Sequence, residues 1–387
     1  MHIGKRYSPI EFIKWTRGDT YWMLLLSAIP TSLYAIGLTF LVLPWQPIAI
    51  MGTAVAFIVG FKNNASYNRM WEARQIYGAI VNDSRSFAYT LRDALNQNNT
   101  ETIRRIFYRH FAWLTALRFQ LRETRVWENM LLKRNKEFQE AHYQIPERMS
   151  TLDLELKRYL SEQELVYILS KKNRATQLSA KQSEELANLR RSGSLNDFQW
   201  TQLQEALIRL TEGQGKAERI KNFPYPRNFA SIATYLLLIF VVLAPFGLLR
   251  EFENLGSGTF LNGYTIWFNI PFSAVVTWAL HTLDTVGEAS VNPFEGSAND
   301  VPISQISRMI EIDMREMLDE TFLLSCSVRK CLRLQRRAFT TSLYNSAEEK
   351  PSLTFLTPIT RSHQSTLTAH NPRHFLLSLT MCASKSI

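Results

Sequence analysis

The first 320 residues of this 387-residue chain contain no cysteine. All three cysteines, Cys326, Cys331 and Cys382, lie in the last part of the sequence. A disulfide framework and a cysteine-based metal site are therefore excluded from residues 1–320. Cys326 and Cys331 have no matching second pair, so we do not expect them to bind zinc. We expect no metal and no cofactor elsewhere.

The chain also lacks the short motifs of common enzymes. It has no Gly-rich phosphate-binding loop, no nucleophile elbow and no HExxH pattern, and its seven His residues are scattered without ligand spacing. We therefore do not expect an enzyme.

A broad excess of positive charge is missing from most of the chain, although the formal net charge is +10. Residues 321–387 hold nine Lys or Arg and two acidic residues, so they carry +7 of this charge and residues 1–320 carry only +3. Binding to nucleic acid needs many cationic side chains to neutralise phosphates. The charge distribution therefore argues against a nucleic-acid-binding protein.

Long uncharged apolar runs are present, at residues 22–43, 47–61, 229–249 and 260–283. A helix needs about 20 apolar residues to cross a bilayer. The second run is short, but the uncharged residues on both sides extend it. The pattern predicts an all-α membrane protein with four transmembrane helices, the first of them retained rather than cleaved as a signal peptide.

The loop charges predict the orientation of these spans. The segment before the first span contains Lys5, Arg6, Lys14 and Arg17, whereas the turn at 44–46 has no charge. Positively charged loops stay on the cytoplasmic side. We therefore expect both termini and the large middle region to be cytoplasmic, in a multi-pass protein of the cell membrane (the inner membrane if the source is bacterial).

The middle region has few Gly or Pro residues and no alternating strand pattern. Apolar residues recur at helical spacing between positions 103 and 117, and a break is expected near Ser192–Gly193–Ser194. This region is thus predicted to be a helical cytoplasmic domain. The expected parts are 1–61 with the first two spans, 62–228 as the cytoplasmic domain, 229–283 with the last two spans, 284–320 as a cytoplasmic segment, and 321–387 as a disordered basic tail.

The second span carries two stripes of residues with a spacing of four. Gly52, Ala56 and Gly60 form a stripe of small residues that would let another helix approach closely. Thr53, Phe57 and Phe61 form a second stripe. Rings of Phe around a symmetry axis could form a narrow apolar neck. The alternative is that both Phe side chains simply fill space between helices.

The sequence after this span, GFKNNASYNRMWEAR at 60–74, closely resembles the signature of the bacterial branch of the bestrophin family. The blocks ERIKNFPYP at 218–226, NPFEGSANDVP at 292–302 and IEIDMRE at 310–316 resemble further family segments, in the right order. The resemblance covers about residues 1–320. It implies a homopentameric channel in the lipid bilayer, with one central pore for chloride or other small ions.

The resemblance also implies site residues. The pore neck corresponds to Thr53, Phe57 and Phe61, and a narrow cytoplasmic aperture corresponds to Tyr225 between two prolines. Thr53 differs from the bulky apolar residue often found there, which predicts a wetter outer ring. Lys62 is expected to add positive charge next to the neck. We expect anion selectivity. The alternatives are a cation-selective channel of the same fold and a non-conducting membrane scaffold.

Animal relatives in this family bind calcium through an acidic run after the Asn-Pro-Phe motif. Here Asn292 matches, but the acidic run is reduced to Glu295 and Asp300, so no calcium gate is expected. Asp284 and Glu288 share a helical face and could suggest a metal site with His281. Ion pairs or hydrogen bonds at a subunit interface are the expected interpretation.

Two further expectations concern charged residues. Arg69, Glu72 and Arg74 are expected to form ion pairs that fix the long second helix between subunits. The tail from Thr321 onward departs from the family pattern, and we expect it to be disordered without function. Pore regulation, or attachment to anionic lipid through the basic residues at 329–337, are the alternatives.

Overall fold

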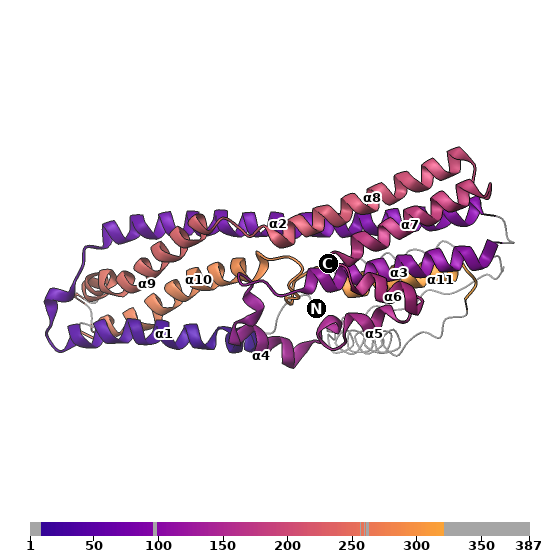
Figure 1. Ribbon diagram of the computed structural model, residues 1–387. Coiled ribbons are helices and arrows are strands. Elements are labelled where there is room, and N and C mark those ends of the chain that lie inside the picture. The colour runs from indigo at the N-terminus through magenta and orange to yellow at the C-terminus, as the bar shows by residue number, and fades with distance from the viewer. Residues whose placement is uncertain (1–8, 96–98, 256, 259, 261–262, 321–387) are drawn as a thin grey trace, which may run out of the picture. The chain divides into compact units, whose positions relative to one another are not determined.

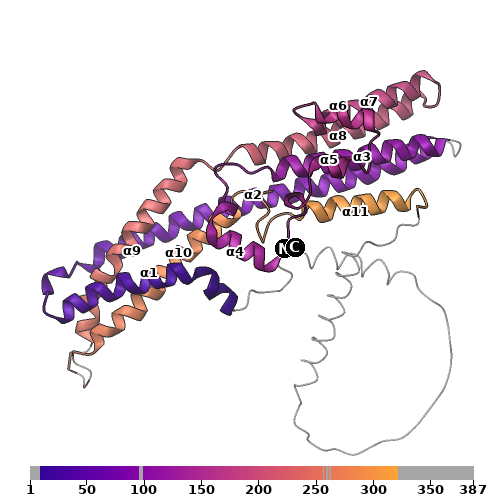
Figure 2. The ribbon, with the colours of Figure 1, turned by 60° about the horizontal axis from the view of Figure 1, so that its bottom comes forward.

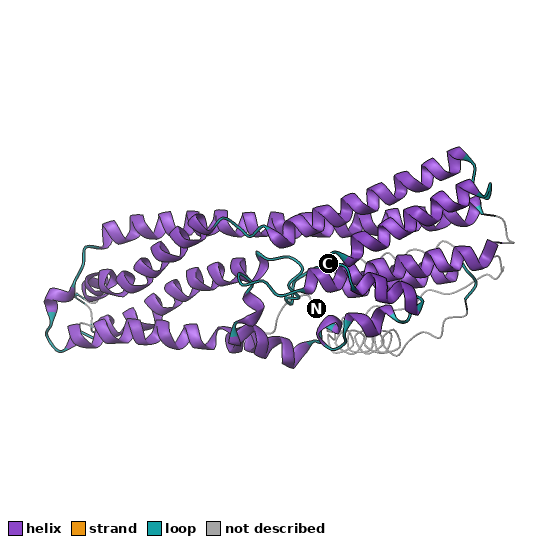
Figure 3. Ribbon diagram, in the orientation of Figure 1, coloured by secondary structure: helices purple, strands orange, loops and turns teal. Residues whose placement is uncertain are grey.

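The computed structural model describes residues 9–95, 99–255, 257–258, 260 and 263–320. Within these ranges the chain is helical and has no strand (Figure 3). The α-helices are α1 (Pro9–Ala35), α2 (Trp45–Ala94), α3 (Thr100–Arg122), α4 (Lys133–His142), α5 (Leu152–Leu156), α6 (Glu162–Leu169), α7 (Arg174–Arg191), α8 (Asp197–Asn222), α9 (Arg227–Leu255), α10 (Asn269–Ser290) and α11 (Ile303–Glu316). The prediction of an all-α protein is confirmed.

Helix α2 runs along the whole helical unit (Figure 1). Its 50 residues extend about 75 Å at the usual rise of a helix. The helix packs against α9 and α10 toward one end and against α8 and α11 toward the other. The expected domain boundary between residues 61 and 62 therefore lies inside one continuous helix.

Three helical segments of the described chain are long and apolar enough to cross a membrane. They are α2, α9 and Thr265–Ser290, which joins the 3-10 helix η5 (Thr265–Phe268) to α10. They contain most or all of the second, third and fourth predicted runs. Where they meet α1, Met23, Val55, Phe240 and Ala274 belong to one buried apolar cluster.

The first predicted span differs from the structure. The run 22–43 is not one helix, because α1 ends at Ala35, Gly37 adopts a φ of +105° and the short 3-10 helix η1 (Thr39–Leu41) follows. The charge-free part of α1, residues 20–35, is thus about 24 Å long, less than the roughly 30 Å of a bilayer core. A single 22-residue first span is wrong, and a crossing by α1 stays a prediction. The other half of α1 contains four charged residues, Glu11, Lys14, Arg17 and Asp19.

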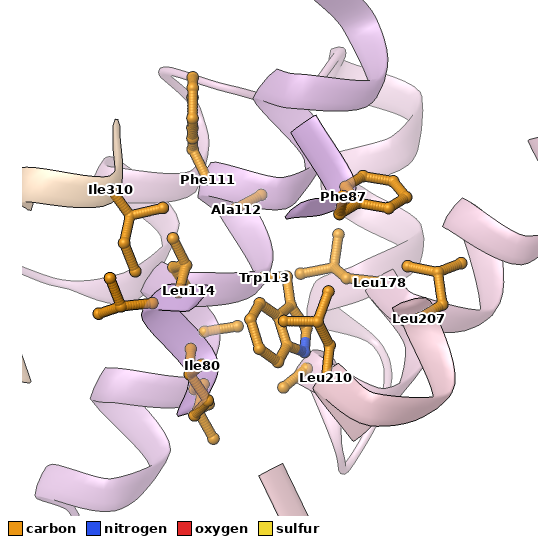
Figure 4. Close-up of a cluster of buried hydrophobic side chains, with 14 of the residues drawn as sticks. Ile80, Phe87, Phe111, Ala112, Trp113, Leu114, Leu178, Leu207, Leu210 and Ile310 are labelled. Carbon is orange, nitrogen blue, oxygen red and sulfur yellow. The ribbon is translucent and has the colours of Figure 1, made fainter. Parts of the chain in front are cut away.

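Helices α5, α7, α8 and α11 pack around α3 in a second apolar core, to which the C-terminal half of α2 also contributes. The predicted helical spacing over residues 103–117 is confirmed, because α3 buries Ile103, Phe107 and Leu117 on its inner face. Trp113 points into the centre of this core, and its indole nitrogen donates a hydrogen bond to Oε1 of Gln214 over 2.9 Å. The neighbouring side chains in Figure 4 include Ile80, Leu114, Leu178, Leu207 and Leu210.

The predicted break in the polar stretch before α8 is also confirmed. Helix α7 ends at Arg191, and Gly193 adopts a φ of +77°, which glycine tolerates best. Asn196 then caps α8, because its side chain accepts a hydrogen bond from the Gln199 amide over 2.8 Å. The two helices consequently lie side by side (Figure 2). The tail 321–387, with the three cysteines and the basic residues at 329–337, lies outside the described residues.

Candidate functional site

The three predicted neck residues share the exposed face of α2. Phe57 and Phe61 are 67% and 58% exposed, and Thr53 is exposed as well. The two Phe rings lie 4.5 Å apart at an angle of 86°, so that the edge of one meets the face of the other. Val55 and Val59, on the opposite face, are fully buried. The neck residues are thus turned away from the core of their own chain.

The hydroxyl of Thr53 is occupied within its own helix. Its Oγ1 donates a hydrogen bond to the carbonyl oxygen of Ala49 over 3.0 Å. The oxygen keeps lone pairs that can accept hydrogen bonds from water. The Thr53 side chain is therefore less apolar than its two Phe neighbours, but its hydroxyl proton points to the backbone of its own helix.

The stripe of small residues has two different surroundings. A Cβ atom on Gly52 would lie 2.6 Å from the Phe240 ring, so the close approach of α2 and α9 requires glycine here. Gly60 has no such neighbour within 4 Å, and Ala56 is exposed. The predicted close helix contact is confirmed at Gly52 only. The other two small residues face away from the described chain.

Lys62 follows Phe61 directly but lies on the other side of α2. Its side chain is 4% exposed, and its Nζ lies 2.7 Å from Oδ1 of Asp284 and 3.0 Å from Oε1 of Glu288. A step of one residue turns a helix by about 100°, which moves Lys62 off the Phe61 face. The charge of Lys62 is therefore buried and paired with two carboxylates of α10, which reduces the positive charge expected next to the neck.

The same contacts resolve the interpretation of the acidic residues on α10. Asp284 and Glu288 both bind Lys62, whereas His281 lies with its Nε2 3.4 Å from Oδ1 of Asp19. The ion-pair interpretation is confirmed, but the pairs form within one chain. They join α10 to α2 and to α1.

Arg69 binds backbone carbonyls and not acidic side chains. Its Nε donates to the carbonyl oxygen of Val291 over 3.0 Å, and its Nη2 donates to those of Ile220 and Phe223 over 3.1 and 2.9 Å. The planar guanidinium group carries several N–H donors, so it can bind carbonyl oxygens from different segments at the same time. One side chain of α2 thus holds the ends of α8 and α10. Within the described chain these contacts take the place of an ion pair of Arg69, and a pair between subunits stays a prediction.

Glu72 does form an ion pair, with Arg219 of α8, within the same chain. This pair and the Arg69 contacts join α2 to the C-terminal end of α8. They fix the position of the segment that follows α8.

Tyr225 lies in that segment, between the end of α8 at Asn222 and the start of α9 at Arg227. Pro224 and Pro226 cannot donate the hydrogen bonds of a continuing helix, which explains the interruption. The Tyr225 side chain is partly exposed. Tyr225 therefore lies in a short connection between two helices. Arg69 binds this connection at Phe223, two residues before Tyr225.

The loop after α10 is organised by Asp300. Its Oδ1 accepts hydrogen bonds from the amides of Phe294 and Val301 over 2.8 and 2.6 Å. Its Oδ2 accepts from the amide of Gly296 over 2.7 Å and from Nη1 of Arg122 over 2.6 Å. These bonds hold Phe294 at a φ of +70°, which is unusual for a residue with a side chain. Both oxygens of this carboxylate thus stabilise the loop itself.

Glu295 belongs to this loop and lies in a buried group of charges. Its side chain is almost fully buried, and Oε2 accepts a hydrogen bond from the Asn129 amide over 3.1 Å. Burial, and then the charge of Asp300, raise the pKa of Glu295 to about 8. Nearby, Lys221 and Glu128 form a buried ion pair, and burial lowers the pKa of Lys221.

Sequence reasoning did not find the Lys221–Glu128 pair or the role of Arg69. The two members of the pair are 93 positions apart, and Arg69 binds carbonyl oxygens that every residue has. Neither contact leaves a local pattern in the sequence. Lys221 and Arg69 belong to the family-like blocks at 218–226 and 60–74, whereas Glu128 belongs to none of these blocks.

The chain resembles several known proteins along most of this described region. It is 26% identical over 299 residues to the voltage-dependent anion channel-forming protein YneE of Escherichia coli (strain K12), covering 74% of this chain and 84% of the relative. It is 27% identical over 279 residues to the voltage-dependent anion channel-forming protein RSc3414 of Ralstonia nicotianae, covering 71% and 77%.

The fold agrees with a solved structure. The crystal structure of a bacterial bestrophin homolog from Klebsiella pneumoniae superposes with a TM-score of 0.65 at 23% identity, covering 78% of this chain and 98% of that one. The family model described as bacterial/fungal bestrophin protein matches residues 18–316, well over half of the sequence. This chain belongs to the bacterial and fungal bestrophin family.

Proposed function

We propose that this chain is one subunit of an oligomeric membrane channel that conducts chloride and other small anions. The observation that carries the proposal is the exposed face of α2 with Thr53, Phe57 and Phe61. Two large aromatic side chains on this face find no place in the core of their own chain. Relatives named as anion channel-forming proteins support transport of anions.

In a symmetric assembly, this face of α2 repeats around a central axis. Rings of Phe57 and Phe61 then form an apolar neck that conducts only when it is wetted. The edge of a Phe ring carries partial positive charge, which favours an anion over a cation in the neck. Tyr225 forms a second constriction on the cytoplasmic side, where its hydroxyl can donate a hydrogen bond to a partly dehydrated anion.

The proposed assembly has five subunits, as the family resemblance implies. Exposed apolar side chains on α1 and α9, such as Trp22, Ile29, Phe229 and Leu238, provide surface for lipid or a neighbouring subunit. In this arrangement α1 also crosses the cell membrane, so that the subunit has four spans, and both termini are cytoplasmic.

A cation-selective channel of the same fold is the second candidate. The buried contacts of Lys62 with Asp284 and Glu288 are the observation that favours a cation-selective channel. They remove the positive charge that would have repelled cations next to the neck. Selectivity then depends on the Phe rings and on the exposed residues beyond them.

The reversal potential of purified protein in a planar bilayer under a KCl gradient tests the proposal. We expect reversal near the chloride equilibrium potential, and a larger conductance for Phe57→Ala because the apolar constriction widens. Phe198→Ala, on an 84% exposed side chain of α8, is the matched control and leaves the current unchanged. Reversal near the potassium potential supports the cation channel. Well-folded oligomers without any current would overturn the proposal in favour of a scaffold.

A further inference from the structure

The face of α2 that carries the neck residues continues far beyond them. Steps of four and three residues alternate from Phe57 along the helix, which keeps one side in register. All residues in this register are exposed: Phe57, Phe61, Asn64, Asn68, Trp71, Gln75, Gly78 and Asn82. Four of them, Asn64, Asn68, Gln75 and Asn82, carry amide side chains, and we call these four the amide stripe.

The amide stripe carries no charge, although α2 is rich in charge nearby. None of the six charged residues between positions 62 and 85 shares its register. Several of them are bound elsewhere: Lys62 to Asp284, Arg69 to backbone carbonyls, Glu72 to Arg219, Asp83 to Arg209 and Arg85 to Asp313. The neutral character of this side of α2 is thus local, and these five charged side chains contact other parts of the chain.

The four amide groups are also available for contact. In the part of the chain that the structure describes, no hydrogen bond occupies the side chains of Asn64, Asn68, Gln75 or Asn82. A primary amide has two N–H donors and a carbonyl acceptor, so it can replace water around an anion or a cation. Such groups contact a passing ion without preferring either sign strongly.

We propose that the amide stripe lines the ion path on the cytoplasmic side of the neck and keeps that path weakly charge-selective. This inference rests on the proposed function, because it assumes that the Phe57 side of α2 faces a pore. From Asn64 to Asn82 the stripe extends about 27 Å along the helix. Ions therefore meet successive rings of neutral hydrogen-bonding groups there, and a single charge placed in one ring alters which ions pass.

Single charged substitutions test this role. We expect Asn64→Asp and Asn68→Asp to shift the reversal potential toward the potassium equilibrium potential, and Asn64→Lys to shift it toward the chloride potential. The shifts shrink as KCl is raised, because salt screens fixed charges. Asn188→Asp makes the same change on an exposed residue of α7, outside the register, and leaves the reversal potential unchanged.

Cysteine labelling keeps the inference testable if a charged variant fails to fold. Replacing Cys326, Cys331 and Cys382 by Ser leaves a chain without any cysteine. In that background, Asn64→Cys or Asn68→Cys is treated with an anionic or a cationic methanethiosulfonate reagent. We expect modification to change the current in opposite directions for the two reagents, whereas Asn188→Cys shows no change.

The outcomes separate this inference from the proposed function. Currents that respond to Phe57→Ala but to none of the changes at Asn64 and Asn68 would overturn only the proposed role of the amide stripe in the ion path. No current from the unmutated oligomer overturns both. Reversal-potential shifts at Asn64 and Asn68, with none at Asn188, support both.

Discussion

The Nζ of Lys62 lies 2.7 Å from Oδ1 of Asp284, in a contact where both side chains are less than 10% exposed. This ion pair joins α2 to α10 one residue after Phe61, and Glu288 accepts a second hydrogen bond from the same nitrogen. The position of Phe57 and Phe61 on α2 is therefore tied to α10. A change in this contact is expected to act on the neck through the orientation of α2.

Breaking this pair should destabilise the protein strongly. Lys62→Met leaves the buried carboxylate of Asp284 without its partner, which costs about 3–5 kcal/mol for comparable buried pairs. We expect a clearly lower midpoint of thermal unfolding for the detergent-solubilised oligomer. Lys62→Met combined with Asp284→Leu should recover part of the loss, because the remaining carboxylate of Glu288 is 34% exposed and can be hydrated.

Lys136→Met is the control for this loss. Lys136 and Glu140 form an exposed pair with 65% and 63% exposed side chains, and such pairs contribute about 0–1 kcal/mol. An unchanged midpoint for Lys62→Met would show that the buried pair does not join the two helices.

Gly287→Ala should disturb the same helix contact for a steric reason. A Cβ atom at this position would lie 1.8 Å from Oδ1 of Asn63, whose Nδ2 donates to the carbonyl oxygen of Leu283 over 3.0 Å. Asn63 must move and lose this bond, so we expect a loss of about 1–3 kcal/mol. Thermal unfolding of the variant measures it.

Gly215→Ala separates crowding from helix propensity. Gly215 also lies inside a helix, but no atom lies within 4 Å of an added Cβ. Alanine favours a helix by about 1 kcal/mol relative to glycine, so this variant should be as stable as the wild type or more stable. Equal effects of the two substitutions would contradict the close contact at Gly287.

Glu295 should make stability depend on pH. Its pKa is about 8 in the folded protein, against an ordinary value of 4.5. Between these values the folded state holds a proton that the unfolded state has released, so stability falls as pH rises through this window and levels off above it. Thermal midpoints at about pH 6 and about pH 9, which lie inside and above this window, measure the fall.

Glu295→Gln should remove most of this fall, because the amide stays neutral at both pH values. Glu140→Gln, at an exposed position of α4, should keep the wild-type fall. The same pH dependence in the wild type and in Glu295→Gln would contradict a buried Glu295 that is protonated near neutral pH.

Much of the candidate site could be predicted from local patterns. The spacing of Thr53, Phe57 and Phe61 placed them on one helix face, and the structure leaves that face exposed. Pro224 and Pro226 disfavour a continuous helix around Tyr225, and the break occurs between α8 and α9. The first span was predicted less well, because an apolar run does not show where a turn such as that at Gly37 ends a helix.

The sequence by itself determined the helical character of the protein, the periodicity of α2 and the residues on its exposed face. These properties depend on neighbours within one or two turns of a helix. The tertiary structure decided where the charges go: Lys62 to Asp284, which is 222 positions away, Arg69 to three carbonyl oxygens, and Asp300 to the amides of its own loop. A charged side chain can reach any partner that folding brings close, and backbone acceptors are the same at every residue, so these contacts required the folded chain.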